Sequence, residues 1–208
     1  IANDTLTAVT LDPIPNTPDN TPTLTGTGEP GSTITLTDGP TTLGTTTVGT
    51  DGKWSFTPST PLGEGSHTIV VTTVDPYGNT NTTSGTPATG TDTFIVDTKA
   101  SATVDIKDDT GHDDMISSID NPAATALSGK IDAGGSITSL TVTDAAGHVV
   151  TVPAASITVD ALGNWTATVN VTGLDDGVLT TTLEAKDALG NVAPTATDTI
   201  AKDTVTTV

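Results

Sequence analysis

The residues in this sequence that could do chemistry are mostly aspartates, and one aspartate phrase returns at matched positions along the chain. The phrases IANDT, FIVDT and IAKDT place Asp4, Asp97 and Asp203 in the same local context. Their spacing is that of a small domain, and recurrence at such a spacing indicates tandem repeats. Each copy of the phrase is therefore expected to end one domain and to lead into the next.

Three further phrases recur in the same order in both halves of the chain. They are GEPGSTITL at 28–36 with IDAGGSITSL at 131–140, DGKW at 51–54 with LGNW at 162–165, and VDPYGN at 74–79 with KDALGN at 186–191. This register predicts two domains and two flanking pieces. They are a tail of an upstream repeat or linker at 1–5, domain 1 at 6–98, domain 2 at 99–204, and the start of a next linker at 205–208.

The fold expected for each domain is a β-sandwich. Stretches rich in Thr, Val and Ile alternate with a period of two and are separated by Gly, Pro, Asp and Asn, which is typical of short strands joined by turns. In domain 2 the strands are expected near 102–107, 125–131, 137–144, 148–153, 163–171, 178–187 and 195–202. Seven such strands indicate an all-β protein made of two tandem immunoglobulin-like Greek-key sandwiches, joined end to end through the short segment DTKAS.

Counting the strands predicts that carboxylates and amides from distant segments lie together at the end of each domain where the chain enters. In an immunoglobulin-like sandwich the BC, DE and FG loops cluster at one end. The set expected at the entrance of domain 1 is Asp4, Glu29, Asp75 and Asn79, and the set for domain 2 is Asp97, Asp132, Asp187 and Asn191. Asp51 and Asp160 lie in the DE loops at the same end, where a turn role explains them better than a ligand role.

Clustered carboxylates repel one another unless they are protonated or bind a metal ion. Ligand sets made only of oxygen, without His or Cys, favour Ca²⁺ over zinc or copper, and Mg²⁺ rarely uses an all-protein cage. Ca²⁺ at the domain junctions is therefore the predicted cofactor. The alternative is that these residues are ordinary Asp and Gly turn residues that cap loops. An acidic loop at 105–120 supplies a further candidate set, which could equally be a solvated loop, and its candidate ligands are Asp108, Asp109, Asp113, Asp114 and Asp120.

The composition restricts the possible partners. The net charge is −19 with six Lys and Arg, so nucleic acid and anionic membrane surfaces are unlikely partners. No apolar run is long enough to insert in a membrane. Cysteine is absent, which excludes disulfides and thiolate chemistry. No catalytic motif is present, so the chain is expected not to be an enzyme.

Together the phrases GEPGSTITL, TDGKWSFTP, GEGSHTIVVTTVDPYGN, FIVDT and DDTG…DDMIS resemble the bacterial immunoglobulin-like extender repeats of giant RTX-type surface adhesins. The resemblance implies a spacer at the bacterial cell surface, exported by type I secretion and stiffened by Ca²⁺ at its linkers. It also implies a monomeric rod whose partners are neighbouring repeats of the same polypeptide, and which projects an adhesive tip for biofilm formation or attachment to a host or surface. Domain 2 departs from the pattern at IDAGGS, where Asp132 stands in place of Glu and no Pro follows.

Two other functions stay open from the sequence. The chain could be an adhesin module that itself binds carbohydrate or ice through rows of Thr, or an accessory part of a secreted polysaccharide-degrading enzyme. Trp54 and Trp165 would suit stacking on a sugar. Their matched positions between alternating strand residues favour a role as core residues instead.

Overall fold

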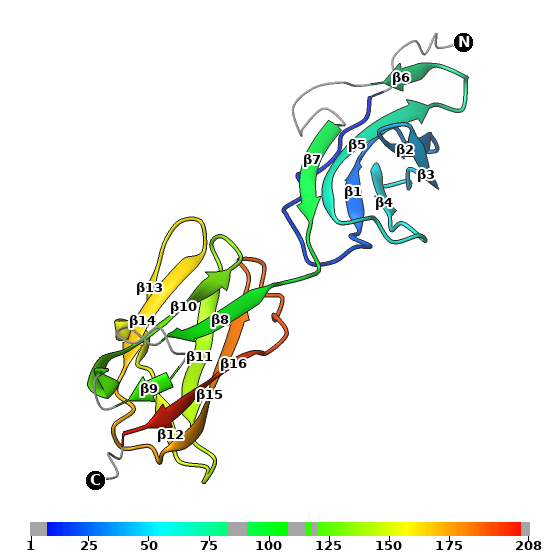
Figure 1. Ribbon diagram of the computed structural model, residues 1–208. Coiled ribbons are helices and arrows are strands. Elements are labelled where there is room, and N and C mark those ends of the chain that lie inside the picture. Colours follow the sequence, from blue (N-terminus) through cyan, green and yellow to red (C-terminus); the bar gives the residue numbers. More distant parts are fainter. Residues whose placement is uncertain (1–7, 83–90, 108–114, 118–119, 205–208) are drawn as a thin grey trace. The chain divides into compact units, whose positions relative to one another are not determined.

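The computed structural model describes residues 8–82, 91–107, 115–117 and 120–204. The chain divides into two compact units, unit 1 from Ile1 to Thr98 and unit 2 from Lys99 to Val208 (Figure 1). Each unit consists of β-strands packed in two layers around its own core, as expected for an immunoglobulin-like sandwich. No helix in the described part of the chain is long and apolar enough to cross a membrane.

Unit 1 contains a small sheet and a larger one. The small sheet pairs β1 with β4, and the larger sheet has the order β3-β2-β5-β6 with β7 paired to β5. The strands are β1 Leu24–Thr27, β2 Thr33–Asp38, β3 Thr41–Thr47, β4 Lys53–Phe56, β5 Gly65–Val74, β6 Thr80–Thr82 and β7 Thr91–Val96. Ile34, Leu36, Ile69 and Val71 point inward from β2 and β5, and they alternate with less buried residues because the side-chain period of a strand is two.

Unit 2 has the same arrangement with longer sheets, in the orders β13-β14-β10-β8 and β12-β11-β15-β16-β9. Its elements are β8 Ala102–Lys107, β9 Met115–Ser117, η2 Pro122–Ala124, β10 Thr125–Ile131, β11 Ser136–Thr143, β12 Val149–Thr151, η3 Ala154–Ser156, β13 Thr158–Val159, β14 Asn164–Val169, β15 Gly177–Lys186 and β16 Ala196–Asp203. The seven strands expected from the sequence correspond to β8, β10, β11, β12, β14, β15 and β16, whereas β9 and β13 were not expected.

The two tryptophans are core residues, as the sequence favoured. Trp54 is 3% exposed and Trp165 is 1% exposed, so neither offers a face to a sugar. The indole N–H of Trp165 donates to the Thr103 carbonyl at 3.2 Å. In the strand register Trp165 lies opposite Gly129, which has no side chain to obstruct the ring. The same pairing occurs in unit 1, where Trp54 lies opposite Gly26.

A side chain at Gly129 would collide with the molecule on two sides. An added Cβ would lie 2.0 Å from the Thr103 oxygen and 2.8 Å from Nε1 of Trp165. Gly129→Ala should therefore lower the free energy of unfolding of unit 2 by about 3 kcal/mol, a typical cost of overpacking. Gly173→Ala is the matched control, because nothing lies within 4 Å of its Cβ position. Urea unfolding of both variants checks this, and equal midpoints would contradict it.

Candidate functional site

The loops predicted to meet at the entrance end do meet in unit 2. The Ser101 hydroxyl and backbone N–H both donate to the Asp132 carboxylate, at 2.6 and 2.7 Å. The backbone N–H of Ile131 donates to the Gly163 carbonyl at 2.9 Å. A Cβ on Gly135 would lie 3.3 Å from the Cα of Asp187. The entering chain, the loop after β10 and the loops before β14 and after β15 therefore share one end of the unit.

Unit 1 repeats this convergence. Gly28 donates to the Gly52 carbonyl at 3.0 Å, and Val9 bridges to Gly28 as the chain enters. A Cβ on Gly31 would contact the Pro76 ring at 3.5 Å, which brings in the loop after β5. Within the loop that follows β1, the backbone carbonyl of Glu29 accepts a hydrogen bond from Ser32 at 3.1 Å. The entrance end of unit 1 therefore gathers the same set of loops.

Asp75 and Asn79 form a compact turn that we call an Asp-capped turn. Oδ1 of Asp75 accepts the backbone N–H groups of Tyr77 and Asn79, each at 2.8 Å, and Oδ2 accepts the Asn79 amide at 2.7 Å. The Asp75 carbonyl accepts the N–H of Gly78, which has a φ of 88°. A glycine suits this position because other residues rarely adopt a left-handed backbone.

Asp187 and Asn191 form the same turn in unit 2. Oδ1 of Asp187 accepts the N–H groups of Leu189 and Asn191 at 2.8 and 2.9 Å, and Oδ2 accepts the Asn191 amide at 2.6 Å. Burial raises the pKa of Asp187, but these hydrogen bonds outweigh it and the net pKa is lowered. The pKa of Asp75 is lowered in the same way, against the effect of burial. Both carboxylates are therefore ionised at neutral pH.

The turn occurs at two further places that the sequence analysis did not connect. Asp160 accepts the N–H groups of Leu162 and Asn164, each at 2.9 Å, and the Asn164 amide at 2.8 Å. The signal was available, because DALGN occurs at both 160–164 and 187–191, and DPYGN at 75–79 is close to it. In unit 1 the equivalent loop is shorter, and Oδ1 of Asp51 accepts only the Lys53 N–H at 3.1 Å.

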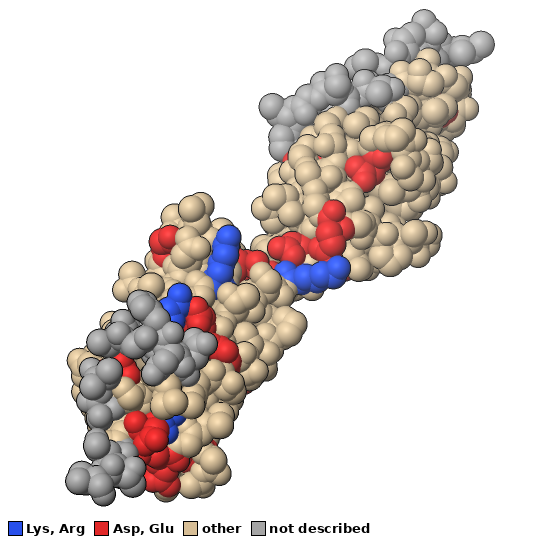
Figure 2. All heavy atoms as spheres, viewed as in Figure 1, with Lys and Arg blue, Asp and Glu red and all other residues tan. Residues whose placement is uncertain are grey.

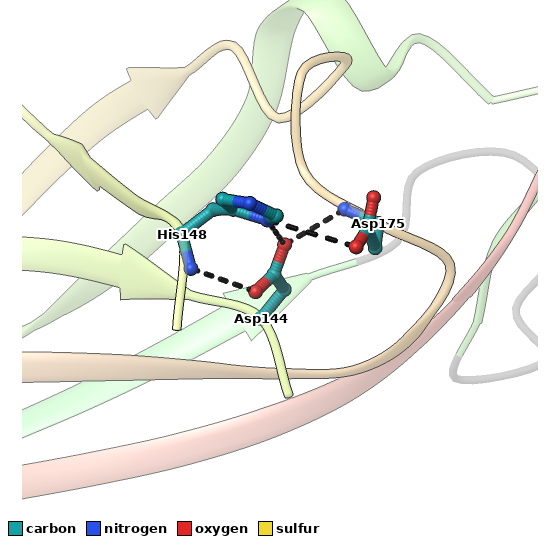
Figure 3. A group of neighbouring side chains, drawn as sticks. All are labelled: Asp144, His148 and Asp175. Carbon is teal, nitrogen blue, oxygen red and sulfur yellow. Dashed lines mark hydrogen bonds and ion pairs between the residues drawn. The ribbon is translucent and has the colours of Figure 1, made fainter. Parts of the chain in front are cut away.

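The fourth Asp-capped turn carries a histidine in the last position. Figure 3 shows Asp144 between His148 and Asp175, and its Oδ2 accepts both His148 Nδ1 at 2.8 Å and the Asp175 N–H at 2.9 Å. The Asp175 hydrogen bond is the main cause of the lowered pKa of Asp144, and the Asp144 hydrogen bond is the main cause of the raised pKa of His148. Within the described residues, this is the one group of three or more His, Asp or Glu ligand atoms that lie within 4.8 Å of one another.

The structure therefore brings the predicted loops together without gathering three of their carboxylates at that spacing within the described residues. Asp97 follows β7, and its backbone N–H donates to the Thr17 carbonyl at 3.1 Å. Five predicted ligands lie outside the described residues: Asp4, Asp108, Asp109, Asp113 and Asp114.

The exit end of each unit holds a contact that explains the threonine of the repeated DT phrase. The Glu64 carboxylate accepts both the backbone N–H of Thr98, at 3.0 Å, and its hydroxyl. In unit 2 Asp176 accepts the same two groups of Thr204, at 3.1 and 3.0 Å. Asp176 also pairs with the buried Lys202 at 2.9 Å, and this hydrogen bond is the main cause of its lowered pKa. The last strand of each unit thus ends in a carboxylate contact.

His67 lies near this end of unit 1, with an acceptor at each ring nitrogen. Nδ1 faces Oδ2 of Asp38 at 2.6 Å, and Nε2 faces the Gly63 carbonyl at 2.8 Å. Burial lowers the pKa of His67, but the hydrogen bonds to Asp38 and Gly63 and the charge of Asp38 outweigh it, so the net pKa is raised. A protonated imidazole, with two N–H groups, satisfies both acceptors.

The comparisons with known proteins identify the class. Residues 11–98 match the sequence model of a family described as the bacterial Ig-like domain, so this part of the chain is a bacterial Ig-like domain, as the resemblance predicted. No curated protein sequence matches.

Among solved structures, the chain is similar to a tetra-tandem repeat from the extending region of a large adhesion protein (27% identity, TM-score 0.43, 95% of this chain and 49% of that one). It is also similar to a Ca²⁺-stabilized adhesin of an Antarctic bacterium described as helping it to bind ice (22%, 0.43, 100% and 51%). The chain therefore spans about half the length of these two structures. A three-Ig titin fragment (10%, 0.53, 96% and 65%) shares the fold.

The Asp-capped turn at Asp187 predicts that two substitutions lower the free energy of unfolding of unit 2 by different amounts. The measurement is made in chelator. Asp187→Ala leaves the N–H groups of Leu189 and Asn191 without their acceptor and should cost about 2 kcal/mol of unfolding free energy. Asn191→Ala removes one side-chain bond and should cost about 1 kcal/mol. Because the folded pKa of Asp187 is lowered, its contribution is present above about pH 4 and lost as the pH falls through the folded pKa. Urea midpoints at pH 7 and pH 3 check both points, and a larger loss for Asn191→Ala would contradict the assignment.

His67 predicts an opposite dependence on pH for unit 1. Its folded pKa is raised, so its stabilisation is fully present below the unfolded pKa of about 6.5 and is lost as the pH rises through the folded value. His67→Gln should cost about 1–2 kcal/mol at pH 6 and less at pH 8. The control is His148→Gln, whose side chain is 60% exposed and should matter less. If His67→Gln keeps the full pH dependence of the unchanged protein, the assignment fails.

Proposed function

We propose that this chain is a structural extender, a pair of spacer repeats of a large bacterial cell-surface adhesin. The supporting observation is that each unit takes the chain in at one end of its longest strand and releases it at the other. In unit 1 the ten-residue β5 has Val74 and Asp75 beside the entrance loops, and Gly65 pairs with Val96 at the exit. Ten extended residues span about 34 Å, so each repeat adds that length to the path of the polypeptide.

The polar surface fits a spacer better than a ligand-binding module. The tryptophans that could stack on a sugar are buried, and exposed Thr side chains are engaged with one another, as in the Thr10–Thr27 and Thr23–Thr57 hydroxyl pairs, each at 2.8 Å. Figure 2 shows acidic side chains exposed on both units. A high net negative charge keeps such a chain soluble and separate from other copies. The extender is therefore proposed to act as a monomer outside the cell, with neighbouring repeats as its partners.

We further propose that Ca²⁺ ions stiffen the linkers, as the sequence predicts. The carboxylates of Asp75 and Asp187 are at the entrance ends with lowered pKa values, so they are available as charged oxygen ligands at neutral pH. The ligands proposed for the junction between the units are Asp97, Asp132, Asp187 and Asn191. An ion there would replace carboxylate repulsion with coordination.

Calcium binding predicts a stability that depends on the metal. An ion that binds only the folded state adds about 2.7 kcal/mol at a hundredfold excess over its dissociation constant. The melting temperature should therefore fall in chelator, recover with Ca²⁺, and recover less with Mg²⁺ because Mg²⁺ seldom uses an all-protein cage. Calorimetric titration of the whole chain checks the binding, and identical melting curves with and without Ca²⁺ would overturn this part of the proposal.

Asp97 is the ligand that should link stiffness to calcium. Asp97→Ala should leave both cores folded and abolish the proposed Ca²⁺-dependent extension. Small-angle scattering, or distance labels placed in the two units, would measure this loss. The matched control is Asp105→Ala, an exposed aspartate of β8 whose carboxylate pairs with Lys107 at 3.0 Å. If Asp97→Ala keeps the response to Ca²⁺, or if Asp105→Ala removes it, the linker site is misplaced.

A further inference from the structure

In unit 1 the segment that precedes β1 runs parallel to the last strand, β7. Thr17 bridges to Val96 in the parallel sense, with the Thr17 N–H donating to the Ile95 carbonyl at 2.9 Å. The Thr17 carbonyl accepts the N–H of the residue after Val96 at 3.1 Å. The Ile95 N–H donates to Oδ1 of Asn16 at 2.8 Å, so a side chain extends the pairing by one bond.

Unit 2 has the same parallel pairing in a longer form. β9 pairs with β16 in the register Met115 with Ala201, Ile116 with Lys202, and Ser117 with Asp203. Ile116 is 1% exposed and Lys202 is 5% exposed, so the pairing is anchored in the core. The Lys202 ammonium donates to the Leu174 carbonyl at 2.7 Å, which ties β16 to the loop before β15.

An aspartate in the last strand of each unit also holds the first segment. Asp92 of β7 accepts the backbone N–H of Ile14, and Asp198 of β16 accepts the N–H of Ile106 at 2.9 Å. Both aspartates stand in the phrase TDT, at 91–93 and 197–199. The first and last segments of each unit are therefore joined by side-chain bonds in addition to backbone bonds.

The direction of these bonds decides how a unit responds to tension. The first segment is pulled toward the entrance end and the last strand toward the exit end. Parallel neighbours pulled in this way slide past each other, so the bonds that join them are loaded together and must break together. Neighbours that are pulled apart from the same end would open one bond at a time. Resistance to pulling is governed by the rate of unfolding, which interactions of this kind control.

We propose that unit 1 yields at lower force than unit 2, because its parallel contact between the first and last segments is shorter. This inference rests on the proposed extender function, which places the chain under tension. Unit 1 has one parallel bridge and the Asn16 side chain, within the described residues. Unit 2 has three paired positions and the buried Lys202. The first event would then lengthen the chain while unit 2 remains folded.

The test is single-molecule force spectroscopy of the whole chain, held at its two termini in chelator. Two unfolding events at different forces are expected. Asn16→Ala should accelerate the low-force event about fivefold at a given force, for the loss of one hydrogen bond of about 1 kcal/mol, and leave the high-force event unchanged. Asp198→Ala should do the same to the high-force event alone.

Thr46→Val is the matched control, because it removes one exposed bond, from Oγ1 to the Ser55 carbonyl at 2.9 Å, that does not join the first and last segments. It should leave both unfolding forces unchanged. The urea midpoints of Thr46→Val and Asn16→Ala are compared to show how far each variant changes stability without force. The inference is overturned if Thr46→Val shifts the low-force event as much as Asn16→Ala, or if Asn16→Ala acts on the high-force event. Because calcium is absent, these outcomes are independent of the calcium titration that tests the linker proposal.

Discussion

The fold depends on the capture of backbone N–H groups by carboxylates at places where strands end. The chain is 2% aromatic, so each core is built mainly from aliphatic side chains around a single tryptophan packed over a glycine, and Phe94 is added in unit 1. Hydrophobic burial of this kind does not fix where a strand stops or how the next one starts. Aspartate side chains supply that information, because an ionised carboxylate forms stronger hydrogen bonds to N–H groups than a neutral acceptor does.

Much of the fold follows from the sequence because strand periodicity and turn residues are local signals. The strands expected at 102–107 and 125–131 have the same bounds as β8 and β10. β9 and β13 were not predicted, since three and two residues show no period and, unlike the three-residue β12, they do not lie within a longer Val- and Thr-rich stretch. Both are short additions at sheet edges whose position depends on a partner strand that is distant in sequence. The matched tryptophans were assigned to the core correctly, but the glycines opposite them require the strand register.

The candidate site was likewise predicted only in part. Counting strands predicted which loops share the entrance end, because the topology of a sandwich determines it. What each carboxylate binds depends on the turn it belongs to, and the hydrogen bonds between Asp187 and Asn191 arise from a glycine in the left-handed region, which spacing alone does not reveal. Likewise, the repeated DT phrase was interpreted through its aspartate alone, whereas its threonine donates to a carboxylate in each unit, to Glu64 or to Asp176.

The Asp-capped turn has a consequence for how such a protein can change over generations. The hydrogen bonds that define it lie within five consecutive residues, as in Asp160 to Asn164, and the Asp144 turn adds a bond from outside, from the Asp175 N–H. A duplication or recombination event that copies a unit therefore copies every turn intact, with no need for a compensating change elsewhere. Core residues are coupled across sheets and must change together, but the turns are genetically self-contained. Arrays assembled from such units can gain or lose units, while each remaining unit keeps the residues that form its own turns.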